Sequence, residues 1–438
     1  MNSNLTEALH RSNLLFEGHP LNRELQAEVV LLFFHWSVLS TEKLTLDESL
    51  LDTSVSKYSI QAFARAGEHP YLTEALEGCF RYWARQTQVH GAVLFHPDHL
   101  PNFQQLKSKD LFQLIVIWND YLKDFSTASP TPSQRIQQEL SQLKSWLIAQ
   151  IPDRATVYFT PPPVRQFMLE LLDVFGAPNS IYDPFCRDGA LLIETAKSLS
   201  IKRIYGLTPD RLGWKLSQLM LDFQEEMFTN FQQVNALQYG NTSKEYDAIV
   251  CNPPFGKLSP REDEDAPLWM RSETAYVDHI ARHLSKTGRA VIVVPQSFLS
   301  TPQKETRDLR LRLLKQGTIE GVVLLPPGSS YETKTQTALL VLNNLEHWGE
   351  VVLGELSALS DPEVSAATAL QYFALRSEDK TNDLGKSYPT EKLLKSNGIL
   401  TPSYYGRSLE YQNQNLPTSD SLLEEGKQLH QALERLHL

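Results

Sequence analysis

The sequence is poor in cysteine and contains no long apolar run. Its 438 residues include three cysteines, Cys79, Cys186 and Cys251, without the spacing of metal ligands. An odd, low count excludes a disulfide framework and favours a reducing compartment. The apolar run over 29–34 is too short to cross a bilayer, and the first thirteen residues are polar, with no signal-peptide core. These absences predict a cytoplasmic protein with no membrane segment and no metal site.

Positive charge is also scarce. There are 41 Lys and Arg against 52 Asp and Glu, a net charge of −11 at pH 7. This balance argues against a protein that binds nucleic acid unaided, and it favours a partner that supplies much of the phosphate binding. The hydrophobic fraction of 41% is ordinary for a globular protein, and the length indicates two or three domains.

The first 150 residues have a helical pattern. Apolar residues recur at three- and four-residue spacing over 21–39 and over 110–125. A Ser/Thr/Pro-rich loop is predicted over 126–134. We therefore expect a helical N-terminal domain over 1–152.

Short apolar runs alternate with helical stretches from residue 153 onward. Strands are predicted at SIYDPF (180–185), RIYGL (203–207), YDAIV (246–250), RAVIVVP (289–295), IEGVVLLP (319–326) and TALLVLNNL (337–345), and the helix over 306–317 should end in a glycine cap. This alternation predicts an α/β domain over 153–355, with a mostly parallel sheet and helices on both faces. Ligands of such sheets bind at the carboxyl ends of the strands.

The C-terminal extension, 356–438, has a weaker pattern that ends in an amphipathic stretch. Leu422, Leu429, Leu433 and Leu436 fall on one stripe. The stripe is explained either by a terminal helix docked on its own domain or by a seam for a partner helix.

Three motifs carry chemistry, and the first is IYDPFCRDGALLIE (181–194). A strand ends in a carboxylate, Asp183, and a turn then leads into a helix. This is the shape of a nucleotide-type cofactor loop. Such loops normally use glycines, because a Cβ blocks the approach of the ligand, but only Gly189 is found in this turn.

The second motif, CNPPFG (251–256), follows the apolar run YDAIV. Two prolines make a stiff wall. The side-chain carbonyl of Asn252 and the backbone carbonyl of Pro253 can both accept from one exocyclic amino group, and Phe255 can stack on a flat ring. A planar amine that has been removed from stacked bases needs this combination. A rigid turn with a buried Phe is the alternative.

The third motif is VYFTPPPV (157–164), just before the first strand of the sheet. Thr160 can cap the helix that follows or contact a cofactor held by the next loop.

In this order and at these intervals, YFTPPPV, DPFCRDGA and NPPFG resemble the modification subunit of type I restriction–modification systems, among the amino-group DNA methyltransferases. Downstream, HLSKTGRAVIVVPQSFLS, IEGVVLLPPGSSYETKTQTALLVL and NGILTPSYYG are similar to further stretches of that family. The resemblance implies a Rossmann-like, S-adenosylmethionine-dependent methyltransferase sheet with a helical N-terminal domain and a C-terminal helical tail. It implies methyl transfer to the exocyclic nitrogen of a flipped adenine in DNA.

The resemblance also assigns roles to residues. The base would be clamped by Asn252, Pro253, Pro254 and Phe255. The cofactor would lie against Tyr158, Thr160, Asp183, Pro184, Cys186, Gly189, Thr208, Asp210, Asn235 and Asn252. Asp183, Gly189 and Thr160 would lie by its methionine part, and Asn235 near its adenine.

The chain departs from the family pattern in the cofactor loop. Arg187 and Asp188 replace the expected glycine and small residue, and Thr208 stands where an acidic residue should bind the ribose, with Asp210 two residues later. These departures motivate a second hypothesis, a methyltransferase-fold subunit with impaired cofactor binding that acts as a scaffold or DNA clamp. A third is a methyltransferase of glutamine side chains, although those enzymes typically have Tyr after Asn-Pro-Pro.

No target-recognition domain is evident, and the segment REDED (261–265) would repel phosphate. The resemblance implies a separate DNA-specificity subunit that reads double-stranded DNA. It also implies a second copy of the chain and a restriction subunit as further members of the assembly.

Overall fold

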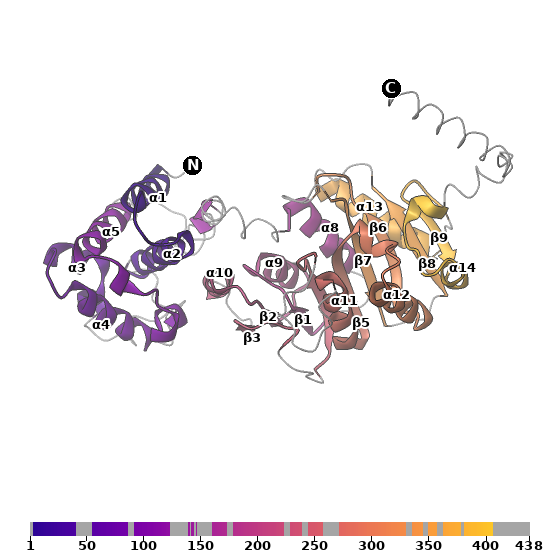
Figure 1. Cartoon of the computed structure of the whole chain (residues 1–438), viewed down its shortest axis with the longest axis horizontal. Helices are drawn as coiled ribbons and strands as arrows, with labels where there is room; N and C mark the ends of the chain where they lie inside the picture. The colour runs from indigo at the N-terminus through magenta and orange to yellow at the C-terminus, as the bar shows by residue number, and fades with distance from the viewer. Residues whose placement is uncertain are drawn as a thin grey trace, which may run out of the picture.

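The structure, a computed structural model, describes most of the chain between residues 3 and 405 (Figure 1). The described residues are 3–40, 55–85, 92–122, 139–140, 142–143, 146, 160–172, 178–222, 228–238, 244–256, 271–329, 335–344, 349–356, 362–377 and 381–405. Four predicted features lie outside them: the loop over 126–134, Tyr158, the acidic segment 261–265 and the leucine stripe of the C-terminal tail.

The N-terminal part is helical, as predicted. Its helices are α1 (Ser3–Phe16), α2 (Arg23–Leu39), α3 (Ile60–Ala66), α4 (Leu72–Ala84) and α5 (Ser108–Tyr121). Asn22 caps the start of helix α2, because its side chain accepts a hydrogen bond from the backbone N–H of Leu25. Every residue of α2 from Ala27 to Leu39 is buried. Among the described residues, no helix has both the length and the apolarity needed to cross a bilayer.

The second part of the chain builds one nine-stranded sheet in the order β3-β2-β1-β4-β5-β7-β6-β8-β9. The strands are β1 (Ser180–Asp183), β2 (Arg203–Leu207), β3 (Phe228–Gln232), β4 (Tyr246–Cys251), β5 (Leu284–Pro295), β6 (Ile319–Leu324), β7 (Thr337–Asn343), β8 (Glu350–Glu355) and β9 (Gly385–Pro389). The order reverses between β1 and β4, which run parallel side by side. Strand β2 lies on the far side of β1. A crevice at such a reversal is the usual ligand site of open α/β sheets.

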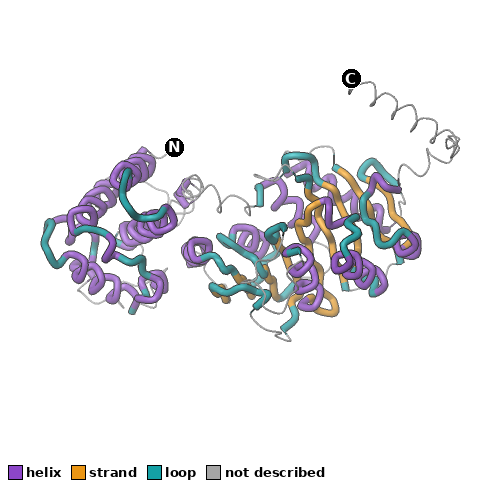
Figure 2. The backbone as a smooth tube through the Cα atoms, viewed as in Figure 1, coloured by secondary structure: helices purple, strands orange, loops and turns teal. Residues whose placement is uncertain are grey.

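Helices cover both faces of this sheet (Figure 2). They are α8 (Pro162–Leu172), α9 (Ala190–Ser198), α10 (Arg211–Asp222), α11 (Ser272–His283), α12 (Lys304–Lys315), α13 (Pro362–Ser377) and α14 (Thr390–Lys395). Neighbouring residues of β1 face opposite layers: Ile181 belongs to the core with α8, α9 and α13, and Tyr182 to the core with α11, α12 and α14. Burial on both faces explains the nearly continuous apolar runs of the strands.

Helix α10 joins the helical part to the sheet. Its residues Leu212, Trp214, Leu216 and Leu219 belong to the apolar core of the N-terminal helices. The indole N–H of Trp214 also donates to the carbonyl of Phe231 in β3, at 3.2 Å. The N-terminal helices therefore pack on an element that begins at the ligand-binding edge of the sheet.

Three strands were not predicted from the sequence: β3, β8 and β9. Five of the eight strand pairings in the described sheet are parallel, and β7 and β9 run antiparallel to their neighbours. Because β9 pairs with β8, the sheet extends past residue 355, while the expected domain limits themselves stay predictions. The glycine cap of α12 is confirmed, since Gly317 adopts a φ of +68° just after the helix.

Candidate active site

The turn after β1 is built around Asp183. This carboxylate is 1% exposed, and its Oδ1 accepts a hydrogen bond from the backbone N–H of Phe185 at 2.9 Å. The turn ends at Gly189, with a φ of +75°, where α9 begins. A Cβ at Gly189 would lie 3.1 Å from both Phe231 and Ser217, so backbone conformation and packing both favour glycine here.

The end of β2 is occupied by a hydrogen-bonded cap. The Thr208 hydroxyl accepts from the backbone N–H of Asp210 at 3.2 Å, and Asp210 Oδ2 accepts from the backbone N–H of Gly213 at 2.8 Å. Arg187 Nη1 lies 3.9 Å from the same Oδ2. One oxygen of the predicted ribose ligand Asp210 is therefore engaged in capping α10 and in an ion pair.

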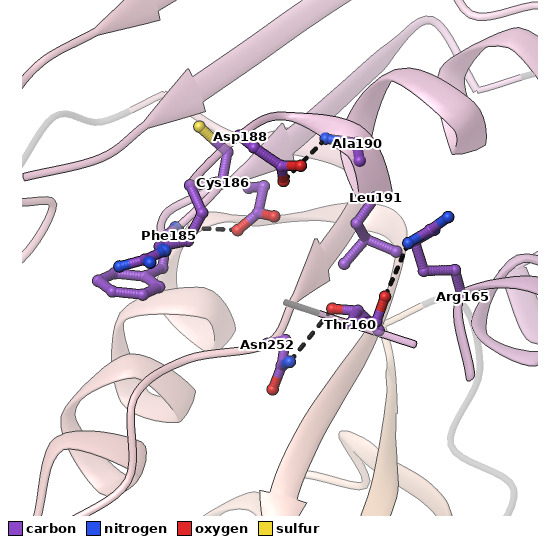
Figure 3. Close-up of a pocket in the computed structure, with 10 residues that line it drawn as sticks. Thr160, Arg165, Phe185, Cys186, Asp188, Ala190, Leu191 and Asn252 are labelled. Atoms are coloured by element: carbon purple, nitrogen blue, oxygen red, sulfur yellow. Dashed lines mark hydrogen bonds between the residues drawn. The ribbon is translucent and has the colours of Figure 1, made fainter. Parts of the chain in front are cut away.

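Asn252 follows β4 and points toward Thr160 (Figure 3). Its Nδ2 donates to the Thr160 hydroxyl oxygen at 3.1 Å. The backbone carbonyl of Thr160 in turn accepts from Arg165 Nη1 at 2.8 Å. Two predicted residues that lie 92 positions apart in sequence are thus in direct contact.

Two residues at the start of α11 form hydrogen bonds with the Asn-Pro-Pro-Phe-Gly segment. The Ser272 hydroxyl donates to the carbonyl of Pro254 at 2.5 Å, and the Glu273 carboxylate accepts from the backbone N–H of Gly256 at 3.0 Å. Glu273 is fully buried and paired with Arg271. The sequence analysis missed Ser272 and Glu273, because isolated polar residues at a helix start carry no motif.

The turn after β1, the segment that contains Thr160 and the end of β4 line one pocket at the carboxyl ends of β1 and β4. Four predicted residues line it: Thr160, Asp183, Cys186 and Asn252. The other lining residues are Arg165, Phe185, Arg187, Asp188, Ala190 and Leu191 (Figure 3). The predicted residues Pro184, Gly189, Thr208, Asp210, Asn235, Pro253, Pro254 and Phe255 are not part of its lining.

Some of the residues outside the lining have other partners. Asn235 follows β3 and its Oδ1 accepts from the backbone N–H of Leu237 at 3.0 Å. Phe255 is half-buried and packs against the core that contains α8 and α9. The roles predicted for these residues stay predictions.

Burial perturbs the pKa of Asp183 and of two nearby thiols. Desolvation raises the pKa of Asp183 to about 7, although hydrogen bonds from Phe185 N–H and from the Cys251 thiol oppose the shift. Burial likewise raises the pKa of the Cys186 and Cys251 thiols well above the ordinary value. Both thiols are therefore neutral and unsuited to nucleophilic chemistry.

A family profile described as N-6 DNA Methylase matches residues 146–372, just over half of the 438 residues. The matched stretch contains every residue that lines the pocket.

Individual relatives are distant in sequence. The chain is 21% identical over 301 residues to the Type I restriction enzyme HindI methylase subunit of Haemophilus influenzae, an alignment that covers 61% of this chain and 68% of that protein. It is 22% identical over 185 residues to the Type II restriction enzyme and methyltransferase RM.BcgI of Heyndrickxia coagulans, covering 39% of this chain and 28% of that protein.

Solved structures match nearly the whole chain. A modification subunit of a putative type I restriction enzyme from Vibrio vulnificus YJ016 superposes with a TM-score of 0.70 at 15% identity, covering 92% of this chain and 96% of that one. The type I restriction-modification methyltransferase subunit from Streptococcus thermophilus has a TM-score of 0.66 at 15% identity, covering 92% and 99%. The predicted fold class, an α/β methyltransferase sheet with a helical N-terminal region, is confirmed.

Proposed function

Because the chain belongs to the N-6 DNA methylase family, we propose that it methylates the N6 amino group of an adenine flipped out of double-stranded DNA. S-adenosylmethionine is the proposed methyl donor. The observation that carries this proposal is the contact between Asn252 and Thr160 in the pocket that Asp183 also lines. The pocket thus brings residues of all three motifs to one place.

The position of the pocket suits such a cofactor, and four of the residues proposed to hold it line the pocket. The pocket lies at the end of β1, where the strand order reverses, and left-handed φ values at Arg187 (+50°) and Gly189 (+75°) turn the backbone tightly into α9. When bound, S-adenosylmethionine supplies an electrophilic methyl group on a positively charged sulfur. In this proposal Tyr158, Thr160, Asp183, Pro184, Cys186, Gly189, Thr208, Asp210, Asn235 and Asn252 hold it.

The base clamp acts on the target amine. Asn252 Oδ1 and the Pro253 carbonyl each accept a hydrogen bond from one N–H of this amine. These two hydrogen bonds reduce the conjugation of the nitrogen lone pair with the ring. Pro254 and Phe255 complete the clamp, and Phe255 stacks on the base. Ser272 bonds the carbonyl of Pro254, the next one along the chain, and so fixes the backbone that presents the Pro253 carbonyl.

We further propose that a DNA-specificity subunit selects the site. The net charge of −11 leaves a large share of phosphate binding to a partner. A chain of a type I restriction-modification system whose complex assembly has been described matches this chain with a TM-score of 0.65 at 19% identity, which supports a role in a multi-subunit complex. A second copy of the chain and a restriction subunit are further proposed members of a cytoplasmic assembly.

The alternative function is a scaffold or DNA clamp with impaired cofactor binding. The hydrogen bond from Gly213 and the ion pair with Arg187 favour it, because they compete with a ribose hydroxyl for Asp210 Oδ2. Isothermal titration with S-adenosylmethionine separates the two functions. Binding that Asp183→Ala abolishes supports the enzyme, and absence of binding by the folded chain supports the scaffold.

Methyl transfer tests the proposed function directly. The full chain, alone and with a DNA-reading partner, is incubated with labelled S-adenosylmethionine and DNA, and the products are identified by nucleoside mass spectrometry. We expect N6-methyladenine, and a decrease in kcat of roughly a hundredfold to a thousandfold in Asn252→Ala. Asn102→Ala, in an exposed turn of the helical part, is the matched control. Methylated glutamine in protein, or no methylated product, would refute the proposal.

A further inference from the structure

A chain of polar contacts leads to Asn252 from the cofactor side of the pocket. Asn252 Nδ2 donates to the Thr160 hydroxyl at 3.1 Å, and the Thr160 carbonyl accepts from Arg165 at 2.8 Å. Arg165 then binds both carboxylate oxygens of Glu194 in α9, at 2.7 Å and 3.1 Å. Figure 3 shows Arg165, Thr160 and Asn252 in this succession.

The orientation of the Asn252 carboxamide matters because its two ends are chemical opposites. The oxygen accepts hydrogen bonds and the nitrogen donates them. An amino group to be methylated donates, so it needs the oxygen. The terminal torsion of Asn is broad and roughly two-fold, so the backbone alone does not choose between the two ends.

Thr160 restrains this torsion. Its hydroxyl oxygen accepts from Nδ2, which places Oδ1 on the opposite side of the carboxamide. Because a hydroxyl can also donate, the hydrogen bond holds the carboxamide in place and does not by itself select one end. Thr160 is itself 6% exposed, and Arg165 holds its carbonyl. The forked contact between Arg165 and Glu194 restricts the guanidinium to one geometry. The hydroxyl therefore has a fixed place relative to α9, which begins at the cofactor turn.

We propose that Thr160 is a positioning residue that holds the Asn252 carboxamide where its Oδ1 can reach the amino group to be methylated. The inference rests on the proposed function and deepens it, because it gives Thr160 a task on the base side of the pocket. The competing role, predicted from sequence, is contact with the cofactor. The two roles predict different effects: loss of the positioning role lowers kcat, whereas loss of cofactor contact raises the Kd for S-adenosylmethionine.

The test compares Thr160→Val with Thr160→Ser in the assembly in which the unaltered chain is active. Valine keeps the shape and removes the hydroxyl, whereas serine keeps the hydroxyl. We expect kcat at saturating substrates to fall roughly tenfold to hundredfold in Thr160→Val, as for a misplaced catalytic contact. The Kd for S-adenosylmethionine, measured by calorimetry on the isolated chain, should stay within about twofold, and Thr160→Ser should recover most of kcat.

Thr195→Val is the matched control. Thr195 is buried in α9, and its hydroxyl donates to the Leu191 carbonyl at 2.7 Å without contacting Asn252. Its kcat should equal that of the unaltered chain. Unchanged kcat in Thr160→Val would overturn the inference, and so would a raised Kd with unchanged kcat, which would assign the hydroxyl to the cofactor. No methylation by the unaltered chain would overturn the proposed function and this role with it.

Discussion

Arg187 occupies a backbone conformation that its turn imposes on any residue. Its φ of +50° lies in the left-handed region, which is unfavourable for a residue with a Cβ by about 1–2 kcal/mol. The family pattern that the sequence resembles has glycine at this place, and the left-handed φ explains why a glycine would suit it. The substitution therefore leaves the path of the loop intact and changes what projects from it: a guanidinium that lines the pocket and pairs with Asp210.

Asp183 should make stability depend on pH in the direction opposite to most carboxylates. Its pKa rises from 3.8 to about 7 on folding, mainly through burial. Because the folded state binds this proton more tightly, stability should fall as the pH rises from about 4 to about 7. Relative to Asp183→Asn, the unaltered chain should lose free energy of unfolding on the order of a few kcal/mol across this window.

Urea titrations at several pH values measure this difference. The asparagine oxygen can still accept from Phe185 N–H, so the variant keeps the turn and removes only the titration. Parallel stability curves for the two proteins would show that Asp183 titrates normally in the folded state.

Among the helices, the contact between α2 and α10 depends on a buried acid. Glu28 is 9% exposed, lies 3.0 Å from Arg211 Nε and also pairs with Lys215. Lys215 is 3% exposed, and burial lowers its pKa to about 8, so it is still mostly charged at neutral pH. The sheet and the helical part therefore meet across a desolvated ion pair.

Glu28→Gln should destabilise the chain by about 3–5 kcal/mol, because it leaves the Lys215 ammonium buried without a carboxylate. Equilibrium unfolding followed by circular dichroism measures the change. Glu24→Gln on the exposed face of α2 should shift stability by no more than about 0.5 kcal/mol. Adding Lys215→Met to Glu28→Gln should restore most of the loss. Equal stability of the two single variants would refute this account of the interface.

The sequence predicted the central strands well, for a physical reason. Strands β1, β4, β5, β6 and β7 are buried on both faces over most of their length, and each contains a buried apolar run. Strand β3 has the sequence FTNFQ and β9 has GKSYP, and neither alternates nor stays apolar. The antiparallel direction of β7 was also not predictable, since side-chain pattern does not encode strand direction.

The motifs predicted which residues come together in the fold, and the roles of these residues stay predictions. Thr160, Asp183, Cys186 and Asn252 line one pocket although they come from three separate segments. Their supports were not predictable: Arg165, Glu194, Ser272 and Glu273 act through contacts that only the folded chain creates. In the sequence alone, a helical Glu that binds a specific partner looks the same as one that is only exposed to solvent.

The charge of the whole molecule bears on how it meets DNA. A net charge of −11 opposes the approach of a polyanion, and non-specific affinity for DNA depends on the number of phosphates that Lys and Arg neutralise. Methylation at a defined site still requires that one sequence be preferred over others. Within the proposed function, this preference has to come from a second subunit.

The isolated chain should therefore bind DNA weakly and without sequence preference. At physiological salt we expect a Kd no tighter than the non-specific range of roughly 10⁻⁴ to 10⁻⁶ M. Fluorescence anisotropy with two duplexes measures this, one carrying the sequence that the complete assembly methylates and one with the same bases scrambled. The two duplexes should bind this chain equally and separate only when the DNA-reading partner is added. Tight, selective binding by the chain alone would mean that it contains its own reader of DNA sequence, and the proposed division of labour between two subunits would be wrong.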